Sequence, residues 1–215
     1  MSDISKNMDR YYSKLDSYQR AYYGEIFSKS VVCVDAPAGT GKTTIAIMAA
    51  LQLLYEGKIN HIYYVRFPDD RSLKLGYIPG DTREKQEMYM YPFYDACYEF
   101  GLSTKDIEEM IQNEDVILQT DITMRGTNIQ RSIVIIDEGQ NGHFSDLKLV
   151  LTRVHDDCKC VLIGHSGQYD NFRGKNENAF VAYIDHLTKK NWAVKCDLPI
   201  NYRGKISSWA DKLEM

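Results

Sequence analysis

The sequence predicts an α/β protein with a mostly parallel sheet, and three observations lead to this class. A glycine-rich loop, Ala36–Thr43, stands between a short β-branched run and a long stretch rich in Ala and Leu. The run Ile133–Ile136 shows no polar alternation, which is typical of a strand buried on both faces of a parallel sheet. A further apolar run at 160–163 also ends in glycine. Strands that alternate with helix-length stretches favour a parallel arrangement.

The other elements follow in chain order. The helices are expected at about 9–27, 43–55, 104–112, 145–154 and 178–189, with a last one ending near 214. Gly57 is the expected stop of the second helix. A further helix should begin at the capping pair Asp81 and Glu84, and Pro92 should break or restart it. The strands are expected at 31–34, 61–65, 115–119, 133–136, 160–163 and 193–198. We expect one domain over 1–215, with a helical insertion at about 66–113.

The glycine-rich loop has the pattern and the strand–loop–helix context of a P-loop. Gly39 and Gly41 let backbone N–H groups curve around a phosphate, and the helix N-terminus adds partial positive charge. Ala36 stands where the pattern has its first glycine, and we expect this small residue to be tolerated. The residues expected to contact ATP are Ala38, Gly39, Thr40, Gly41, Lys42, Thr43 and Thr44. A glycine-rich turn without a ligand is the alternative.

Two carboxylates, Asp137 and Glu138, end the buried strand at 133–136. Ligands of open α/β sheets bind at the carboxyl ends of the strands, where the P-loop also lies. We expect Thr43 and Asp137 to hold Mg²⁺, Lys42 to contact the β- and γ-phosphates, and Glu138 to polarise the attacking water. ATP and Mg²⁺ are therefore the predicted cofactors, and two surface acids are the alternative.

Two glutamines are further candidates. Gln19 precedes Lys42 by about two dozen residues, and its amide offers the donor and acceptor that adenine recognition needs. An exposed polar residue on a surface helix explains Gln19 equally well. Gln168 follows the strand at 160–163, and we expect it to sense the γ-phosphate.

The composition limits the class of protein. The 215 residues carry a net charge of −4, which gives no global support for nucleic-acid binding. The five cysteines are odd in number and form no C-x-x-C pair, so reduced thiols are expected rather than disulfides or zinc. The sequence shows no leader and no apolar run of roughly 18 residues. A cytoplasmic protein without a membrane partner is expected.

Six segments in order carry a family resemblance: APAGTGKT, LGYIPGD, MRGT, IIDEGQN, LTRV and LIGHSGQYD. This series resembles that of PhoH-type P-loop ATPases and, more distantly, the first RecA-like core of superfamily 1 helicases. The resemblance extends from Gln19 to Arg203. It implies a RecA-like three-layer α/β/α sandwich in which one strand separates the Walker A and Walker B strands. It also implies ATP hydrolysis, action on single-stranded RNA or DNA with RNA favoured, and a homo-oligomer, with a hexameric ring as one form. The chain looks like the short, stand-alone form of the family, which phages often encode. A phage origin would place the protein in the host cytoplasm.

The resemblance assigns roles to single residues. Lys42 and Thr43 match Walker A, Asp137 and Glu138 match Walker B, and Gln140 matches the glutamine of a DEAQ-like box. Arg125 matches the arginine of the MRG motif, Gln168 the glutamine of a G-D-x-x-Q box, and Arg203 a late arginine. Two departures are Gly139 for the usual Ala, which we expect to matter little, and His165 for the usual Asp.

A single core lacks the second domain that supplies an arginine finger in helicases. Arg203 or Arg153 is therefore expected to be donated across a subunit interface. A surface salt bridge is the alternative for Arg203. Nucleic acid is expected to meet Arg66 and Arg125, together with nearby basic and tyrosine side chains.

Two other functions stay open. A nucleoside kinase of the type II thymidine kinase kind also carries a P-loop and an Asp-Glu-Gly-Gln box. Such kinases have a paired-cysteine zinc site and a serine after the P-loop lysine, and this chain has neither. The third function is a slow ATP-dependent assembly scaffold, against which an intact Glu138 argues.

Overall fold

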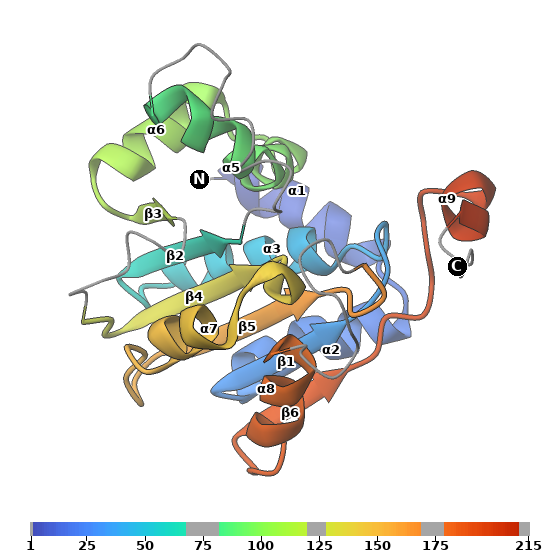
Figure 1. Ribbon diagram of the computed structural model, residues 1–215. Helices are drawn as coiled ribbons and strands as arrows, with labels where there is room; N and C mark the ends of the chain where they lie inside the picture. Colours follow the sequence, from blue (N-terminus) through green and yellow to red (C-terminus); the bar gives the residue numbers. More distant parts are fainter. Residues whose placement is uncertain (1, 68–81, 120–127, 169–178, 211–215) are drawn as a thin grey trace.

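A six-stranded parallel sheet forms the centre of the computed structural model, which describes residues 2–67, 82–119, 128–168 and 179–210 (Figure 1). The strand order is β3-β2-β4-β5-β1-β6, and every neighbouring pair is parallel. The strands are β1 (Val31–Asp35), β2 (His61–Arg66), β3 (Val116–Gln119), β4 (Ser132–Asp137), β5 (Lys159–Gly164) and β6 (Ala193–Cys196). Because β5 lies between β1 and β4, one strand separates the two strands that carry the P-loop and the acid pair, as predicted.

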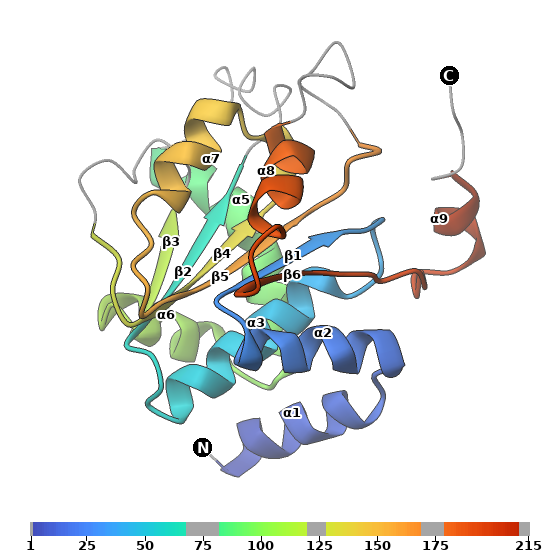
Figure 2. The same ribbon diagram turned by 90° about the horizontal axis from the view of Figure 1, so that it is seen from below.

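Helices cover both faces of this sheet (Figures 1 and 2). α2, α3, α5 and α6 lie on one face with α1 outside them, and α7 and α8 lie on the other. The helices are α1 (Ser2–Ser13), α2 (Ser17–Ser28), α3 (Lys42–Tyr55), α5 (Thr82–Glu99), α6 (Thr104–Gln112), α7 (Phe144–Leu151), α8 (Ala179–Leu187) and α9 (Lys205–Ala210), with a 3₁₀ turn η3 (Gly139–Asn141). The predicted RecA-like three-layer α/β/α sandwich is confirmed.

Alternate residues of the central strands enter two separate cores. In β1, Val32 and Val34 pack under α3, while Val31 and Cys33 face the opposite core under α8. All six residues of β4 are buried. A strand covered on both faces cannot alternate apolar with polar residues, which is why the uniform run at 133–136 predicted it correctly.

Local signals fix α3 as predicted. Its first residue is Lys42, directly after the left-handed Gly41. Gly57 adopts φ +66°, the Lys58 N–H donates to the Leu53 carbonyl, and the Gly57 N–H donates to the Leu54 carbonyl. This pair of bonds is the Schellman arrangement that ends helices at glycine.

Two predictions about helices are wrong. The stretch 9–27 is not one helix, because Asp16 ends the turn after α1 and caps α2. α5 runs through Pro92 without a break. A proline inside a helix costs about 3 kcal/mol, but Phe93 and Cys97 on the following turn are fully buried against α3 and the sheet, and burying such side chains offsets the cost.

The described part of the expected insertion belongs to the main core. Phe100 and Ile107 are fully buried in the same cluster as α3. Asp81, the expected helix cap, lies outside the described residues. Among the described helices, none is both long and apolar enough to cross a membrane.

Candidate functional site

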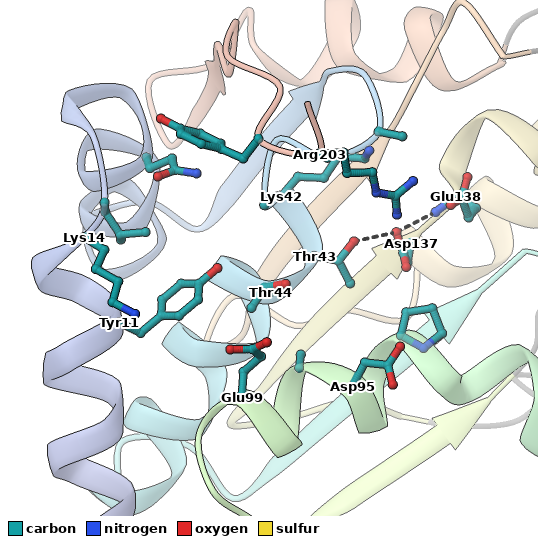
Figure 3. Close-up of a pocket in the computed structure, with 18 of the residues that line it drawn as sticks. Tyr11, Lys14, Lys42, Thr43, Thr44, Asp95, Glu99, Asp137, Glu138 and Arg203 are labelled. Carbon is teal, nitrogen blue, oxygen red and sulfur yellow. Dashed lines mark hydrogen bonds between the residues drawn. The ribbon is translucent and has the colours of Figure 1, made fainter. Parts of the chain in front are cut away.

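A cleft of about 810 Å³ lies at the carboxyl ends of β1, β2 and β4 (Figure 3). The P-loop and the start of α3 form its floor, and α1, α2 and α5 supply walls. Its lining includes the predicted site residues Gln19, Ala38, Gly39, Gly41, Lys42, Thr43, Thr44, Arg66, Asp137, Glu138, Gln168 and Arg203. The fold thus brings together side chains from positions 19 to 203.

The P-loop has the backbone that its sequence demands. Gly39 and Gly41 adopt φ +81° and +83°, a region that side chains with a Cβ rarely enter. The Lys42 ammonium donates to the Pro37 carbonyl across 3.1 Å, which keeps its charge over the loop. Ala36 is buried and its N–H donates to the Gly164 carbonyl of β5. Ala36 therefore continues the hydrogen bonding between β1 and β5 by one residue, at the carboxyl end of the sheet.

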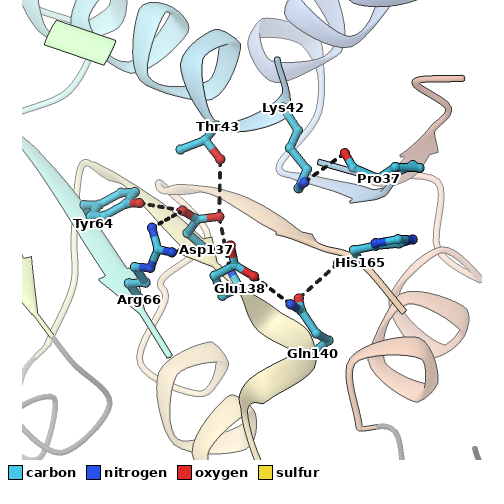
Figure 4. A network of polar contacts seen from close by, with 9 residues as sticks. All are labelled: Pro37, Lys42, Thr43, Tyr64, Arg66, Asp137, Glu138, Gln140 and His165. Atoms are coloured by element: carbon cyan, nitrogen blue, oxygen red, sulfur yellow. Dashed lines mark hydrogen bonds and ion pairs between the residues drawn. The ribbon is translucent and has the colours of Figure 1, made fainter. Parts of the chain in front are cut away.

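Asp137 faces the start of α3 (Figure 4). The Thr43 hydroxyl donates to Asp137 Oδ1 at 3.3 Å, and the Tyr64 hydroxyl donates to Oδ2 at 2.5 Å. Burial raises the pKa of Tyr64 well above its ordinary value, so the phenol keeps its proton and acts as a donor. A hydroxyl and a carboxylate side by side are hard oxygen ligands of the kind Mg²⁺ prefers, so these two residues fit the metal.

Glu138 is held by two side chains. Its backbone is left-handed, with φ +53°. Gln140 Nε2 donates to Glu138 Oε2 at 2.6 Å, and Arg66 lies 3.4 Å from Oε1. Gln140 Oε1 in turn accepts the His165 N–H at the end of β5. Gln140 therefore ties the acid to the loop that carries Gln168.

The space around position 139 is tight, contrary to our expectation that Gly139 in place of the usual alanine matters little. A Cβ at Gly139 would lie 2.8 Å from the Phe180 ring and 3.0 Å from Leu162. Both neighbours are fully buried. The large aromatic of α8 uses the space that an alanine methyl would fill.

Gln19 lies beside the P-loop and not on an open surface. It is buried, its Nε2 donates to the Thr40 carbonyl at 3.0 Å, and its Oε1 accepts the Asp16 N–H. The Gln19 amide therefore stabilises the P-loop through Thr40 and caps the N-terminus of α2 through Asp16. One hydrogen and one lone pair remain for adenine, and the adenine contact stays a prediction.

The segment Asn201–Arg203 crosses the mouth of the P-loop. The Tyr202 N–H donates to the Gly39 carbonyl at 2.8 Å, and the Tyr202 hydroxyl donates to the Asp16 carboxylate. A Cβ at Gly39 would lie 2.7 Å from Arg203 Cγ. Glycine is needed here to let this segment approach.

Arg203 lies in the cleft of its own chain, where Figure 3 shows it beside Lys42 and Asp137. A single chain does not test the expected donation of Arg203 across a subunit interface, but this position favours action within its own chain. Arg153 follows α7, and its carbonyl accepts the Ile129 N–H near the amino end of β4. It lies at the opposite edge of the sheet, and its action on a neighbour stays a prediction.

The other predicted residues are placed as follows. Thr40 is a buried residue of the P-loop, and Gln168 lines the cleft. Arg66 is the last residue of β2 and contacts both acids, so it lies inside the cleft. Arg125 lies outside the described residues. The structural parts played by Tyr64, Tyr202 and Phe180 were missed, because their partners are remote in sequence.

Residues 13–201 match the family described as PhoH-like protein. A PhoH-like protein of Synechocystis is 34% identical over 152 residues, covering 71% of this chain and 46% of the relative. One from Bacillus subtilis is 32% identical over 164 residues, covering 76% and 51%. The chain thus spans about half the length of the curated relatives it matches.

Solved structures agree on the fold. The helicase MrfA bound to DNA and AMPPNP gives a TM-score of 0.54 at 11% identity, covering 94% of this chain and 29% of that one. The DEAD-box helicase Mss116 bound to ssRNA and UDP-BeF gives 0.51 at 14% identity, covering 92% and 43%. At such identities the likeness concerns the fold alone, whereas the sequence match extends through the P-loop and the acid pair. The chain therefore belongs to the PhoH-like protein family and is a P-loop NTPase of RecA-like fold.

Proposed function

We propose that this protein binds ATP with Mg²⁺ and hydrolyses it, and that single-stranded nucleic acid, RNA in preference to DNA, stimulates the reaction. The observation that carries the proposal is the 3.3 Å contact between Thr43 and Asp137, because it joins the P-loop to the acid strand in one cleft. A phosphate-binding loop alone fits many ligands, but a loop facing an acid pair fits phosphoryl transfer.

The residues divide the work. Backbone N–H groups of the P-loop and Lys42 hold the phosphates, and Thr43 and Asp137 hold the metal. Mg²⁺, when bound, neutralises charge on the phosphates. Glu138 orients the attacking water and accepts its proton, in a position that Gln140 fixes. Arg203 supplies positive charge toward the phosphates from the same chain.

The nucleic-acid part rests on other support. MrfA and Mss116, which share the fold, were solved with DNA and with ssRNA. In this chain, Tyr91 on α5 is 58% exposed and offers an aromatic face for stacking. Of the two arginines expected to meet nucleic acid, we assign Arg125 to this contact, because Arg66 lies in the cleft beside the acids.

Self-association is part of the proposal. α9 stands away from the sheet in Figures 1 and 2, and it carries Ile206 at 80% and Trp209 at 77% exposure. Exposed apolar side chains of this size are enriched at contacts between proteins. Light scattering with and without ATP should show a mass above that of one chain.

The test is ATP turnover with and without a single-stranded RNA or DNA 20-mer, in the wild type and in Glu138→Gln. We expect RNA to raise the turnover of the wild type several-fold and DNA to raise it less. The Glu138→Gln variant should show no turnover. The variant should still bind ADP, because the P-loop is untouched. Turnover indifferent to both polynucleotides would remove the nucleic-acid role, and phosphorylation of added nucleosides would replace hydrolysis with a kinase reaction.

A further inference from the structure

Within the described residues, Arg66 is a cation that contacts both acids of the site. It is the register partner of Asp137 in the β2–β4 pair, so the sheet itself sets the two side by side. Arg66 Nη1 lies 3.6 Å from Asp137 Oδ2, and Nη2 lies 3.4 Å from Glu138 Oε1 (Figure 4). Burial acts to lower the pKa of Arg66, but Asp137, Tyr64 and Glu138 outweigh it and raise that pKa, so the guanidinium stays charged.

The two contacts of Glu138 differ in quality. The bond from Gln140 to Oε2 is 2.6 Å, whereas Arg66 lies 3.4 Å from Oε1. A close charge-assisted hydrogen bond between guanidinium and carboxylate measures about 2.7–2.9 Å. Gln140 therefore fixes the acid firmly, and Arg66 holds it loosely enough to exchange for a better anion.

The nearest place for such an anion is the same cleft. Arg66, Lys42 and Arg203 all line it, and the Arg66 side chain is 22% exposed toward it. A phosphate group with two free oxygens can accept two parallel hydrogen bonds from one guanidinium. Glu138 does not do so here, because Oε2 is bound to Gln140 and Oε1 contacts a single nitrogen of Arg66. The terminal phosphate of a nucleoside triphosphate carries such oxygens, and a diphosphate lacks this group.

We propose that Arg66 is a catalytic residue that the terminal phosphate of the bound triphosphate draws away from Glu138, which frees Glu138 Oε1 for the attacking water. This inference rests on the proposed ATP hydrolysis. Water then forms a bond to the γ-phosphorus while the bond to the β–γ bridging oxygen breaks, and that oxygen leaves with its electron pair as part of ADP. Glu138 accepts the proton of the water. The arginine that assists this transfer is thus supplied in cis.

The test compares Arg66→Met and Arg66→Lys with the wild type and with Arg20→Met, a control on the exposed face of α2. Calorimetry measures the Kd of ADP and of AMPPNP with Mg²⁺, and fluorescence anisotropy measures the Kd of a labelled oligouridine 20-mer. We expect Arg66→Met to weaken AMPPNP about tenfold, to leave ADP within twofold, and to lower kcat at least a hundredfold. Arg66→Lys should recover part of the AMPPNP affinity, and Arg20→Met should change neither nucleotide.

Other outcomes would overturn the inference. Equal weakening of ADP and AMPPNP would make Arg66 a support of the cleft. Weaker oligouridine binding with unchanged AMPPNP would make it a polynucleotide contact. A wild type that binds neither nucleotide would instead remove the proposed function itself, so the two failures are distinguishable. Arg66→Lys keeps the positive charge beside the acids. If Arg66→Met does not fold, the same affinities and kcat are measured on Arg66→Lys instead.

Discussion

The buried hydroxyl of Tyr64 donates a 2.5 Å hydrogen bond to Asp137, across the β2–β4 pair. Tyr64→Phe removes this bond and leaves a buried carboxylate oxygen with the distant Arg66 alone. Hydrogen bonds to charged groups contribute about 1.5–3 kcal/mol, so we expect the free energy of unfolding to fall by about that amount. Urea denaturation followed by circular dichroism measures it. Tyr63→Phe, on the opposite face of the same strand, is the control and should lie close to the wild type.

Gly139→Ala should destabilise the protein, because its methyl would meet the Phe180 ring at 2.8 Å. Overpacking of this kind costs about 1–3 kcal/mol. For a chain of this size that corresponds to a fall in Tm of about 2–4 °C per kcal/mol. Adding Phe180→Leu to Gly139→Ala should recover part of the loss by making room. A single variant as stable as the wild type would show that Phe180 moves freely.

Gln19→Glu should weaken nucleotide binding while α2 stays folded. The carboxylate can still accept the Asp16 N–H, but it cannot donate to the Thr40 carbonyl and places negative charge beside it. We expect the substitution to cost about 1.4 kcal/mol of binding free energy, which corresponds to an about tenfold rise in the Kd of ADP. Calorimetry gives the affinity and far-ultraviolet circular dichroism the helix content. Unchanged affinity would mean that nucleotide binding does not depend on the hydrogen bond from Gln19 to the Thr40 carbonyl.

The five cysteine thiols should resist modification by Ellman's reagent in the folded protein. All five are buried. Burial raises the pKa of Cys33 and of Cys97 to about 12 and that of Cys196 to about 11. A raised thiol pKa keeps the group neutral below that value, so at pH 8 the thiolate fraction of these three is about one in a thousand or less. Ellman's reagent should count five thiols in 6 M guanidinium and almost none before it, and rapid native labelling would contradict the burial.

The sequence was sufficient for features that depend on local spacing. The P-loop, the helix that follows it and its stop at Gly57 are encoded within about twenty residues, and the structure has them as predicted. The uniform run before Asp137 likewise indicates a strand buried on both faces. Such features need no knowledge of which strands are neighbours.

Features that depend on pairing distant segments were not predictable in the same way. At position 66 the sequence predicts the start of the insertion and a nucleic-acid contact, whereas the pairing of Arg66 with Asp137 follows from the β2–β4 register. The need for Gly139 depends on a ring from α8, more than forty positions away. The split of the stretch 9–27 into two helices did have a local signal, since Asp16 and Gln19 have capping-box spacing. The amphipathic pattern around it concealed that signal.

The bond between Tyr202 and Asp16, 186 positions apart, has a consequence for synthesis of the protein. One wall of the cleft, at Tyr202, is made about 160 residues after the P-loop. At about 5–20 residues per second, a ribosome needs roughly ten to thirty seconds to cover that interval. During this time Gly39 lacks the Tyr202 backbone that later bonds to it. A nascent chain therefore acquires its complete nucleotide cleft only after Tyr202 has been made, when all six described strands have already been synthesised.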